Sequence, residues 1–90
     1  MFIIEDEFHA EQQDGQFATR QDAIAELKRR AAIPWDEKPN QAPCVNWRSC
    51  GRRYVLIEYD DSQTPWRELS RVDVLDVSAA EVKWLTGAPT

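Results

Sequence analysis

The sequence YVLI at residues 54–57 is apolar at four consecutive positions. Successive side chains of a β-strand point to opposite faces of the sheet, so a strand built from these residues is apolar on both faces. Strands of that kind lie in the middle of a sheet, where other parts of the chain cover both sides. We therefore expect residues 54–57 to form a central strand, paired in a hairpin with a strand that contains Val45 and Trp47.

The N-terminal segment, residues 2–11, alternates between apolar and polar side chains. Ile4 and Phe8 share the apolar phase, which is typical of a half-buried strand. Asp6 interrupts that phase, and we expect a bulge there. The Asp-Gly dipeptide at residues 14–15 favours the positive φ of a tight turn, so it predicts that the chain reverses at this point.

Residues 66–77 also have the composition of a strand, but their apolar phase changes part-way. Val72 and Val74 lie on one phase, whereas Leu75 and Val77 lie on the other. An extra residue in a strand shifts the phase by one position. We therefore expect a β-bulge near Val74.

The segment that follows, residues 78–85, fits two structures. Ser78 and Glu81 have the spacing of a helix capping box. Val82 and Trp84 alternate with polar neighbours, as they would in a final strand. Both alternatives remain open on the sequence alone.

A helix is expected between the first two strand segments. Thr19 is suited to be its N-cap, and Pro34 ends it near Ala32, because the residue before a proline is disfavoured in the α conformation. Glu26 and Arg30 are spaced for an ion pair on the solvent side. The apolar stripe at helical spacing comprises Ala23, Ile24, Leu27 and Ala31.

Together these patterns predict one α+β domain over residues 1–87, followed by a frayed tail at 88–90. The expected architecture has two layers, an antiparallel sheet of four or five strands with the main helix, about residues 20–32, packed on one face. The expected core comprises Phe2, Ile4, Phe8, Ile24, Leu27, Val45, Val55, Ile57 and Leu75.

The charge of the chain is negative overall and unevenly distributed. Eleven Lys and Arg stand against sixteen Asp and Glu, a net charge of −5. That balance favours solubility and disfavours nucleic acid as a partner, without excluding it. Residues 20–53 are the exception, with eight basic and four acidic side chains. The candidates for a local anion-binding patch are Lys28, Arg29, Arg30, Arg48, Arg52 and Arg53.

The sequence predicts a cytoplasmic protein without membrane association. No apolar segment approaches the roughly 20 residues that a membrane-spanning helix needs. The chain becomes acidic at Glu5, where a secretory signal would be basic and then apolar.

The two cysteines, Cys44 and Cys50, are six positions apart. If both lie on one extended strand, a rise of about 3.3 Å per residue places their Cα atoms roughly 20 Å apart. A disulfide tolerates at most about 7 Å between Cα atoms. We therefore expect two reduced thiols.

Large aromatic side chains beside arginines provide the main functional lead. The chain has four tryptophans, which is more aromatic surface than one helix and a short sheet readily bury. Trp35, in the proline-rich segment 34–43, is expected to be the most exposed of them. Because aromatic residues and arginine are enriched at binding hot spots, we interpret the chain as a small non-catalytic protein-binding module. The expected binding residues are Trp35, Trp47, Arg48, Arg52 and Arg53.

Two alternative functions use different chemistry. The first is anion or nucleic-acid binding by the basic residues. The second is a thiol-dependent enzyme centred on Cys50, with neighbouring arginines lowering the pKa of the thiol and His9 as the base. His9 also alternates with Glu7 and Glu11, but these three side chains do not complete a metal site, so no metal or cofactor is expected. The sequence favours a protein that is not an enzyme.

Overall fold

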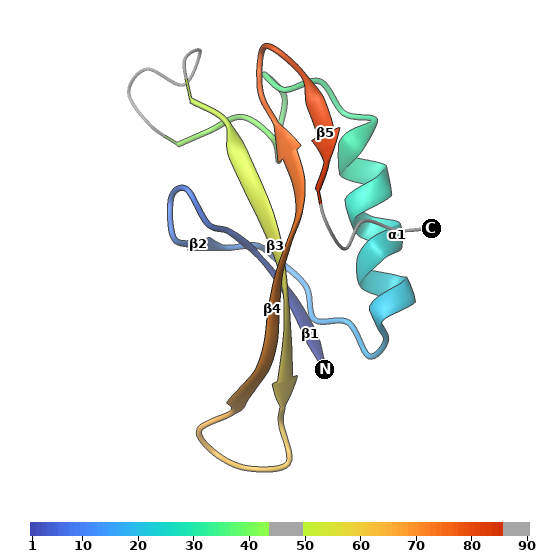
Figure 1. Cartoon of the computed structure of the whole chain (residues 1–90), viewed down its shortest axis with the longest axis vertical. Helices are drawn as coiled ribbons and strands as arrows, with labels where there is room; N and C mark the ends of the chain where they lie inside the picture. The colour runs from blue at the N-terminus through green and yellow to red at the C-terminus, as the bar shows by residue number, and fades with distance from the viewer. Residues whose placement is uncertain (44–49, 86–90) are drawn as a thin grey trace.

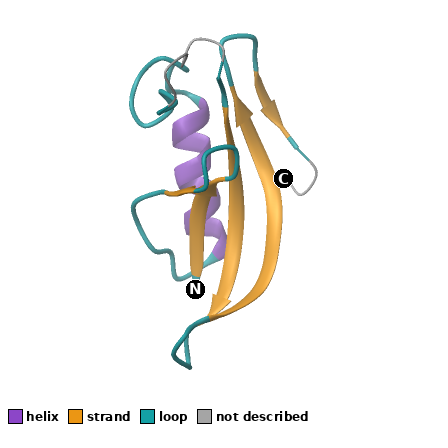
Figure 2. Cartoon of the chain, turned by 90° about the vertical axis from the view of Figure 1, so that its left-hand side faces the viewer, coloured by secondary structure: helices purple, strands orange, loops and turns teal. Residues whose placement is uncertain are grey.

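The computed structural model describes residues 1–43 and 50–85, in which one helix packs on a five-stranded antiparallel sheet. In chain order the elements are β1 (Phe2–Asp6), β2 (Glu11–Gln12), α1 (Arg20–Ala31), β3 (Arg52–Asp60), β4 (Arg67–Val77) and β5 (Val82–Trp84). The strands lie in the order β2-β1-β3-β4-β5 (Figure 1). A view from the side shows α1 covering one face of the sheet (Figure 2). The predicted two-layer α+β fold is confirmed.

β3 is the central strand, as its apolar residues predict. β1 pairs with one of its edges and β4 with the other, both antiparallel. Residues 54–57 are all buried. Residues 44–49, which include Val45 and Trp47 of the expected partner strand, lie outside the described residues.

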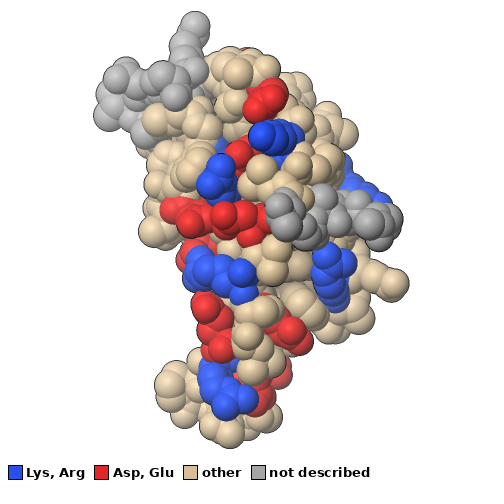
Figure 3. Space-filling view, in the orientation of Figure 1, with Lys and Arg blue, Asp and Glu red and all other residues tan. Residues whose placement is uncertain are grey.

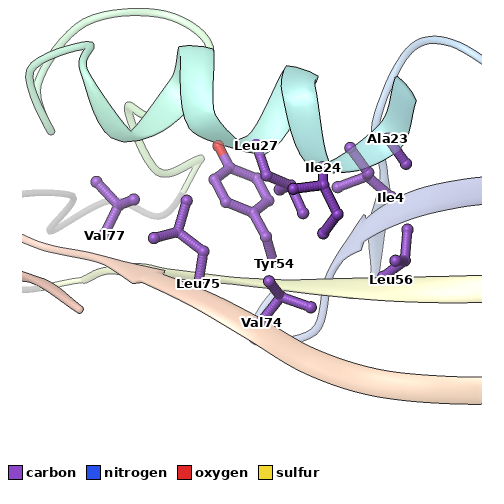
Figure 4. Close-up of a cluster of buried hydrophobic side chains, with 9 residues drawn as sticks. All are labelled: Ile4, Ala23, Ile24, Leu27, Tyr54, Leu56, Val74, Leu75 and Val77. Carbon is purple, nitrogen blue, oxygen red and sulfur yellow. The ribbon is translucent and has the colours of Figure 1, made fainter. Parts of the chain in front are cut away.

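The core lies between α1 and the face of the sheet that the helix covers (Figure 4). Tyr54 points from β3 toward α1, where Leu27 and Ile24 meet it. Val55 and Ile57 are also buried, but on the opposite side of β3, because side chains alternate along a strand. The cluster under the helix comprises Ile4, Ala23, Ile24, Leu27, Tyr54, Leu56, Val74, Leu75 and Val77.

The ends of α1 lie where the sequence predicts them. The hydroxyl of Thr19 accepts a hydrogen bond of 3.1 Å from the backbone N–H of Asp22, as an N-cap residue does. Ala32 is the C-cap residue, and its N–H donates to the carbonyls of Arg29 and Arg30. No helix within residues 1–43 and 50–85 combines the length and the apolar character that crossing a membrane requires.

The N-terminal strand is shorter than its alternating sequence predicts. β1 ends at Asp6, whose carboxylate accepts a 3.1 Å hydrogen bond from the N–H of Phe8 and so closes a turn over residues 7–10. Ala10 completes the turn with a φ of 50°. Phe8 is consequently 54% exposed, and the prediction that it belongs to the core is wrong.

Gly15 has the predicted positive φ, 101°. The chain nevertheless reverses at residues 7–10, and residues 11–17 run on beside β1, so the predicted reversal at Asp14-Gly15 is wrong. The expected bulge at Asp6 is also absent, because β1 pairs with β3 in unbroken register.

The predicted β-bulge is present in β4. Tyr54 pairs with Leu75, but the next residue of β3, Val55, pairs with Asp73. Val74 therefore has no partner on β3, and both it and Leu75 are buried. This extra residue accounts for the change of phase in the sequence.

The C-terminal segment forms a strand, β5, which settles the choice between helix and strand. The N–H of Ser78 donates to the carbonyl of Glu81 at 2.9 Å, and the hydroxyl of Ser78 accepts from the N–H groups of Ala80 and Glu81. The residues of the capping-box pattern thus close the turn between β4 and β5. The expected frayed tail, residues 88–90, lies outside the described residues.

Candidate functional site

A layer of polar side chains lies buried beside the core. Its centre is Asp6, whose carboxylate is fully buried. One oxygen accepts from the backbone N–H groups of Phe8 and Arg53, both at 3.1 Å. The other lies 3.1 Å from Nη1 of Arg52 and 2.5 Å from Nδ1 of His9. Hydrogen bonds and a cation therefore compensate the burial of this carboxylate, which would otherwise be costly.

The Arg52 guanidinium is 6% exposed and joins three parts of the chain. Besides Asp6 on β1, it donates to the Glu11 carboxylate on β2 at 2.8 Å. It also donates to the carbonyls of Asn40 and Gln41, at 3.3 and 2.8 Å. Its hydrogen bond holds the pKa of Glu11 below the usual range. Because its donors are turned inward, this arginine serves to hold the fold together.

Arg30 extends the polar layer to the helix. Its Nε donates to Glu26 at 2.6 Å, so the predicted ion pair forms. Arg30 is only 4% exposed, however, and the prediction of a solvent-side pair is wrong. Its guanidinium lies 5.1 Å from the ring centroid of Tyr54 and donates to the side chain of Gln13 at 2.8 Å. The Tyr54 hydroxyl in turn donates to Asn40 at 2.8 Å, and burial raises the pKa of this phenol.

A polar groove of about 600 Å³ lies against this layer. Among its lining residues are Glu11, Gln13, Lys38, Gln41, Pro43 and Arg52. Within the described part of the chain, every buried side-chain nitrogen and oxygen has a hydrogen-bond partner. The hydrogen bonds within the polar layer therefore satisfy its buried groups, and none of them is left for a ligand in the groove.

The predicted binding residues do not gather on one surface. Arg52 is buried on the α1 side of β3, whereas Arg53 points to the opposite face, as neighbours on a strand must. Arg53 binds the Asp76 carboxylate through two hydrogen bonds of 2.8 and 2.9 Å. Trp47 and Arg48 lie outside the described residues.

Trp35 is partly buried and packs against the core cluster. The prediction that it is the most exposed tryptophan is therefore wrong. The physical reason is that the segment after α1 folds back on the C-terminal end of the helix, where the side chain of Asn40 donates to the carbonyls of Arg30 and Ile33 at 2.8 and 2.9 Å. A binding role for Trp35 stays a prediction.

The basic residues proposed for an anion-binding patch are also dispersed. Arg30 and Arg52 are buried in ion pairs, and Arg53 is paired on the other face of the sheet. Arg29 forms two hydrogen bonds of 2.7 Å with Glu26. Each of these cations already has a carboxylate beside it.

Cys50 is disulfide-bonded, so the prediction of reduced thiols is wrong for this residue. The distance argument assumed one continuous strand, but β3 begins only at Arg52. Cys44 lies outside the described residues. A disulfide-bonded sulfur offers no thiolate nucleophile, and disulfides are rare in the cytosol. A cytoplasmic location stays a prediction that this bond does not favour.

The His9 imidazole bonds the Asp6 carboxylate and does not join Glu7 and Glu11 in a metal site. Among the described residues no three His, Cys, Asp or Glu side chains are placed to hold an ion together.

The face of the sheet turned away from α1 carries alternate bands of basic and acidic side chains (Figure 3). Arg71 on β4 bonds Glu5 at 2.9 Å and lies 3.3 Å from Glu68. Glu7 is placed against Asp73, and this contact between two carboxyl groups raises the pKa of Glu7. Arg53 lies 3.9 Å from the Asp73 carboxylate, so a cation adjoins this pair of carboxyl groups.

The β3–β4 hairpin extends past the end of α1, at the bottom of Figure 1. The reason is length: β4, with 11 residues, spans about 36 Å at 3.3 Å per residue, whereas α1, with 12, spans about 18 Å. Three large apolar side chains are exposed on this part of the chain, Trp66 at 40%, Leu69 at 48% and Val72 at 39%. The Trp66 ring lies 6.0 Å from that of Tyr59.

The outer edge of β4 is only partly covered. β5 pairs with residues 75–77, and one further bond of 2.8 Å joins the N–H of Leu85 to the carbonyl of Val74. No other described residue pairs with β4 on this side. We call the surface formed by the edge from Arg67 to Asp73 and the exposed side chains of Trp66, Leu69 and Val72 the β4 surface.

No family model, curated protein or solved structure matches the chain. The β4 surface is also absent from the site that the sequence predicts. Its signal in the sequence is Leu69, an apolar residue within the polar run at residues 67–71. That signal becomes informative only when the lengths of helix and hairpin are compared.

Proposed function

We propose that the chain is a small non-catalytic protein-binding module that binds its partner through the β4 surface. The observation that supports this proposal is the exposure of Trp66, Leu69 and Val72 beside a strand edge that β5 leaves uncovered. Exposed apolar surface marks interaction sites, and these three side chains recur at every third position from residue 66 to residue 72. Removing them from water stabilises a complex by about 25 cal/mol per Å² of apolar area.

The surface is also suited to binding because its backbone is already in the strand conformation before a partner arrives. Backbone pairing with β3 runs along β4 from Val77 to Arg67, and the Tyr59 and Trp66 rings support its distal end. A preorganised surface loses little conformational entropy when a complex forms. The anion-binding alternative has weaker support, because four of its six cations, Arg29, Arg30, Arg52 and Arg53, are dispersed and paired.

The test is to select binders from a displayed library of random twelve-residue peptides against the immobilised full chain. Changes in the amide chemical shifts of the protein, measured by NMR, then show where on the chain the selected peptides bind. We expect the shifts to concentrate on residues 66–73. The Leu69→Asp variant should lose at least tenfold in affinity, because a charge would replace an apolar contact.

Val82→Asp is the matched control, because Val82 is 45% exposed and lies outside the β4 surface. It should change affinity by less than twofold. Circular dichroism and thermal unfolding verify that both variants fold. Selection of no peptide, or equal losses in the two variants, would show that the β4 surface is not a binding site.

A further inference from the structure

We infer that the partner of the β4 surface is a second copy of this chain, whose β4 pairs antiparallel with the first across a two-fold axis. This inference rests on the proposed function and names the partner. In a two-fold interface the same patch lies on both sides, so that residue i meets residue j and j meets i. The patch must therefore be complementary to itself, in its backbone, its charges and its apolar side chains.

The backbone edge available for pairing comprises residues 67–73 of β4. Within the described residues, β5 and the hydrogen bond from Leu85 to Val74 cover the edge only from Val74 onward. An uncovered strand edge carries unpaired N–H and C=O groups and readily accepts another strand. Because Leu85 occupies the position beside Val74, the strand of a second copy has to end its pairing before that point.

The bulge at Leu69 favours one register for this pairing. Glu68 and Arg71 are three positions apart, which in a regular strand would place them on opposite faces. Their side chains instead lie 3.3 Å apart, because Leu69 has no partner on β3 and shifts the phase. Directly opposite residues of antiparallel strands share a face, so Glu68 of one copy can lie opposite Arg71 of the other.

This register places the two-fold axis between Leu69 and Ser70. Arg67 of one copy then lies opposite Val72 of the other, and Trp66 lies opposite Asp73. The strand pairing therefore ends before Val74, so it does not collide with β5.

The charges of the two edges match in the same register. Glu68 of each copy lies opposite Arg71 of the other, and such opposite-charge pairs stabilise adjacent strands. Arg71 already forms three hydrogen bonds with Glu5 and Glu68 of its own copy, but a guanidinium has five N–H donors. Residues 67–73 carry two basic and two acidic side chains, so two copies of this edge do not repel each other.

The exposed apolar side chains are also arranged symmetrically. Trp66, Leu69 and Val72 recur at every third position, with Leu69 in the middle. A two-fold axis beside Leu69 therefore brings this side chain next to Leu69 of the second copy. It brings Trp66 of each copy next to Val72 of the other, so that all three apolar side chains lose exposure together.

A hollow of about 630 Å³ beside β4 can receive the Trp66 side chain of the second copy. The register places this side chain opposite Asp73, which lines the hollow. An indole ring fits both kinds of surface found there, because it is apolar and its face attracts cations. The hollow is lined by the apolar side chains of Val72, Trp84 and Leu85 and by the cations of Arg53, Arg71 and Lys83.

The size of the interface predicts a weak, reversible dimer. The pairing involves residues 66–73 of each copy, whereas a standard interface involves about 20–30 residues of each partner. Monomer and dimer should therefore exchange, and the dimer fraction should rise with concentration.

Analytical ultracentrifugation of the full chain over a hundredfold range of concentration tests the inference. We expect the dimer fraction to rise with concentration, and the amides of residues 67–73 to become protected from hydrogen exchange in parallel. Leu69→Asp should raise the dissociation constant of the dimer at least tenfold, because it places a charge in the apolar centre of the interface. Val82→Asp is the matched control and should change the dissociation constant less than twofold, since Val82 lies outside the β4 surface.

Two charge reversals test the register. Glu68→Arg and Arg71→Glu each place like charges opposite one another, so each variant alone should associate at least tenfold more weakly than wild type. An equimolar mixture of the two variants restores opposite charges in both pairs and should associate to within about threefold of wild type. Lys28→Glu, at an exposed position of α1, changes the net charge as Arg71→Glu does and should leave association unchanged.

Four outcomes would overturn the inference. The first is a chain that stays monomeric over the whole range, and the second is a dimer that Leu69→Asp and the single charge variants leave intact. The third is a mixture of Glu68→Arg and Arg71→Glu that associates no better than either variant alone. The fourth is protection of residues 67–73 that does not depend on concentration, because the edge would then be covered within one chain.

The two proposals can fail separately. If displayed peptides bind at residues 66–73 and Leu69→Asp weakens their binding, but the chain stays monomeric, the proposed function stands and self-association does not. If neither a peptide nor a second copy binds at these residues, both are wrong.

Discussion

Arg52 and Arg53 show how strongly one step along a strand changes the environment of a side chain. Arg52 is 6% exposed and surrounded by four acceptors, of which Asp6 is fully buried. Arg53 is about one-third exposed and binds Asp76 at the surface. Two adjacent residues of the same type therefore have different energetic roles.

We expect Arg52→Met to lower the free energy of unfolding by about 3–5 kcal/mol, because Asp6 would keep a buried charge without its cation. Arg53→Met is the control and should cost much less, since surface ion pairs contribute little. Urea unfolding of the two variants and the wild type measures both values. Similar losses in the two variants would mean that burial of Asp6 does not depend on Arg52.

At the scale of elements, α1 is fastened to the sheet by polar contacts as well as by its apolar stripe. Glu26 binds Arg29 and Arg30, and Arg30 reaches Gln13 beyond β2. The hydrogen bond from Arg29, followed by that from Arg30, holds the pKa of Glu26 below its ordinary value of 4.5. Ionisation of Glu26 is therefore coupled to ion pairs within α1, one of which holds the Arg30 side chain that bonds Gln13.

This coupling predicts a loss of stability in acid. Because the pKa of Glu26 is lower in the folded chain than in the unfolded one, its contribution is present above about pH 4.5 and is lost as the pH falls through the folded value. We expect Glu26→Gln to be less stable than wild type at pH 7, with the difference shrinking as the pH falls from about 5 to 3.

Urea midpoints at several pH values measure the effect of Glu26→Gln. Glu37→Gln, which removes an exposed carboxylate from the loop after α1, is the control and should follow the wild-type curve. If the stability difference between Glu26→Gln and wild type is the same at all pH values, the loss of stability in acid does not come from the ion pairs of Glu26.

At the scale of the whole molecule, α1 covers one end of the β3–β4 hairpin and leaves the other end uncovered. One end lies under α1 between buried residues, and the other extends beyond the helix, in a molecule with extents of 40 × 29 × 19 Å. Residues 67–72 are exposed along β4, whereas Val74, Leu75 and Val77 are buried. Regions with few buried contacts open with a lower free energy than the core does.

Hydrogen exchange should resolve this difference. We expect the hydrogen-bonded amides of residues 54–57 to exchange only through global unfolding, because both faces of this stretch are covered. Amides of residues 58–60 and 67–70 should exchange faster, through opening of the distal hairpin alone. Equal protection along the whole of β3 would show that the hairpin opens as one unit with the core.

The sequence determined the features that depend on neighbouring residues. The central strand follows from the apolar run at residues 54–57, the start of α1 from Thr19, and the bulge at Val74 from a change of phase. Each pattern acts within one turn or one strand, where the backbone geometry is fixed. Fold class and the identity of most elements could therefore be predicted.

Only the tertiary structure decided which side chains are buried or exposed beyond these patterns. Arg30 and Arg52 are buried because carboxylates distant in the sequence meet them, whereas Phe8 is exposed because Asp6 closes a turn early. The β4 surface exists because the hairpin is about twice as long as the helix that covers it. Burial depends on what the rest of the chain places around a residue, and that arrangement is not encoded in the spacing of its neighbours.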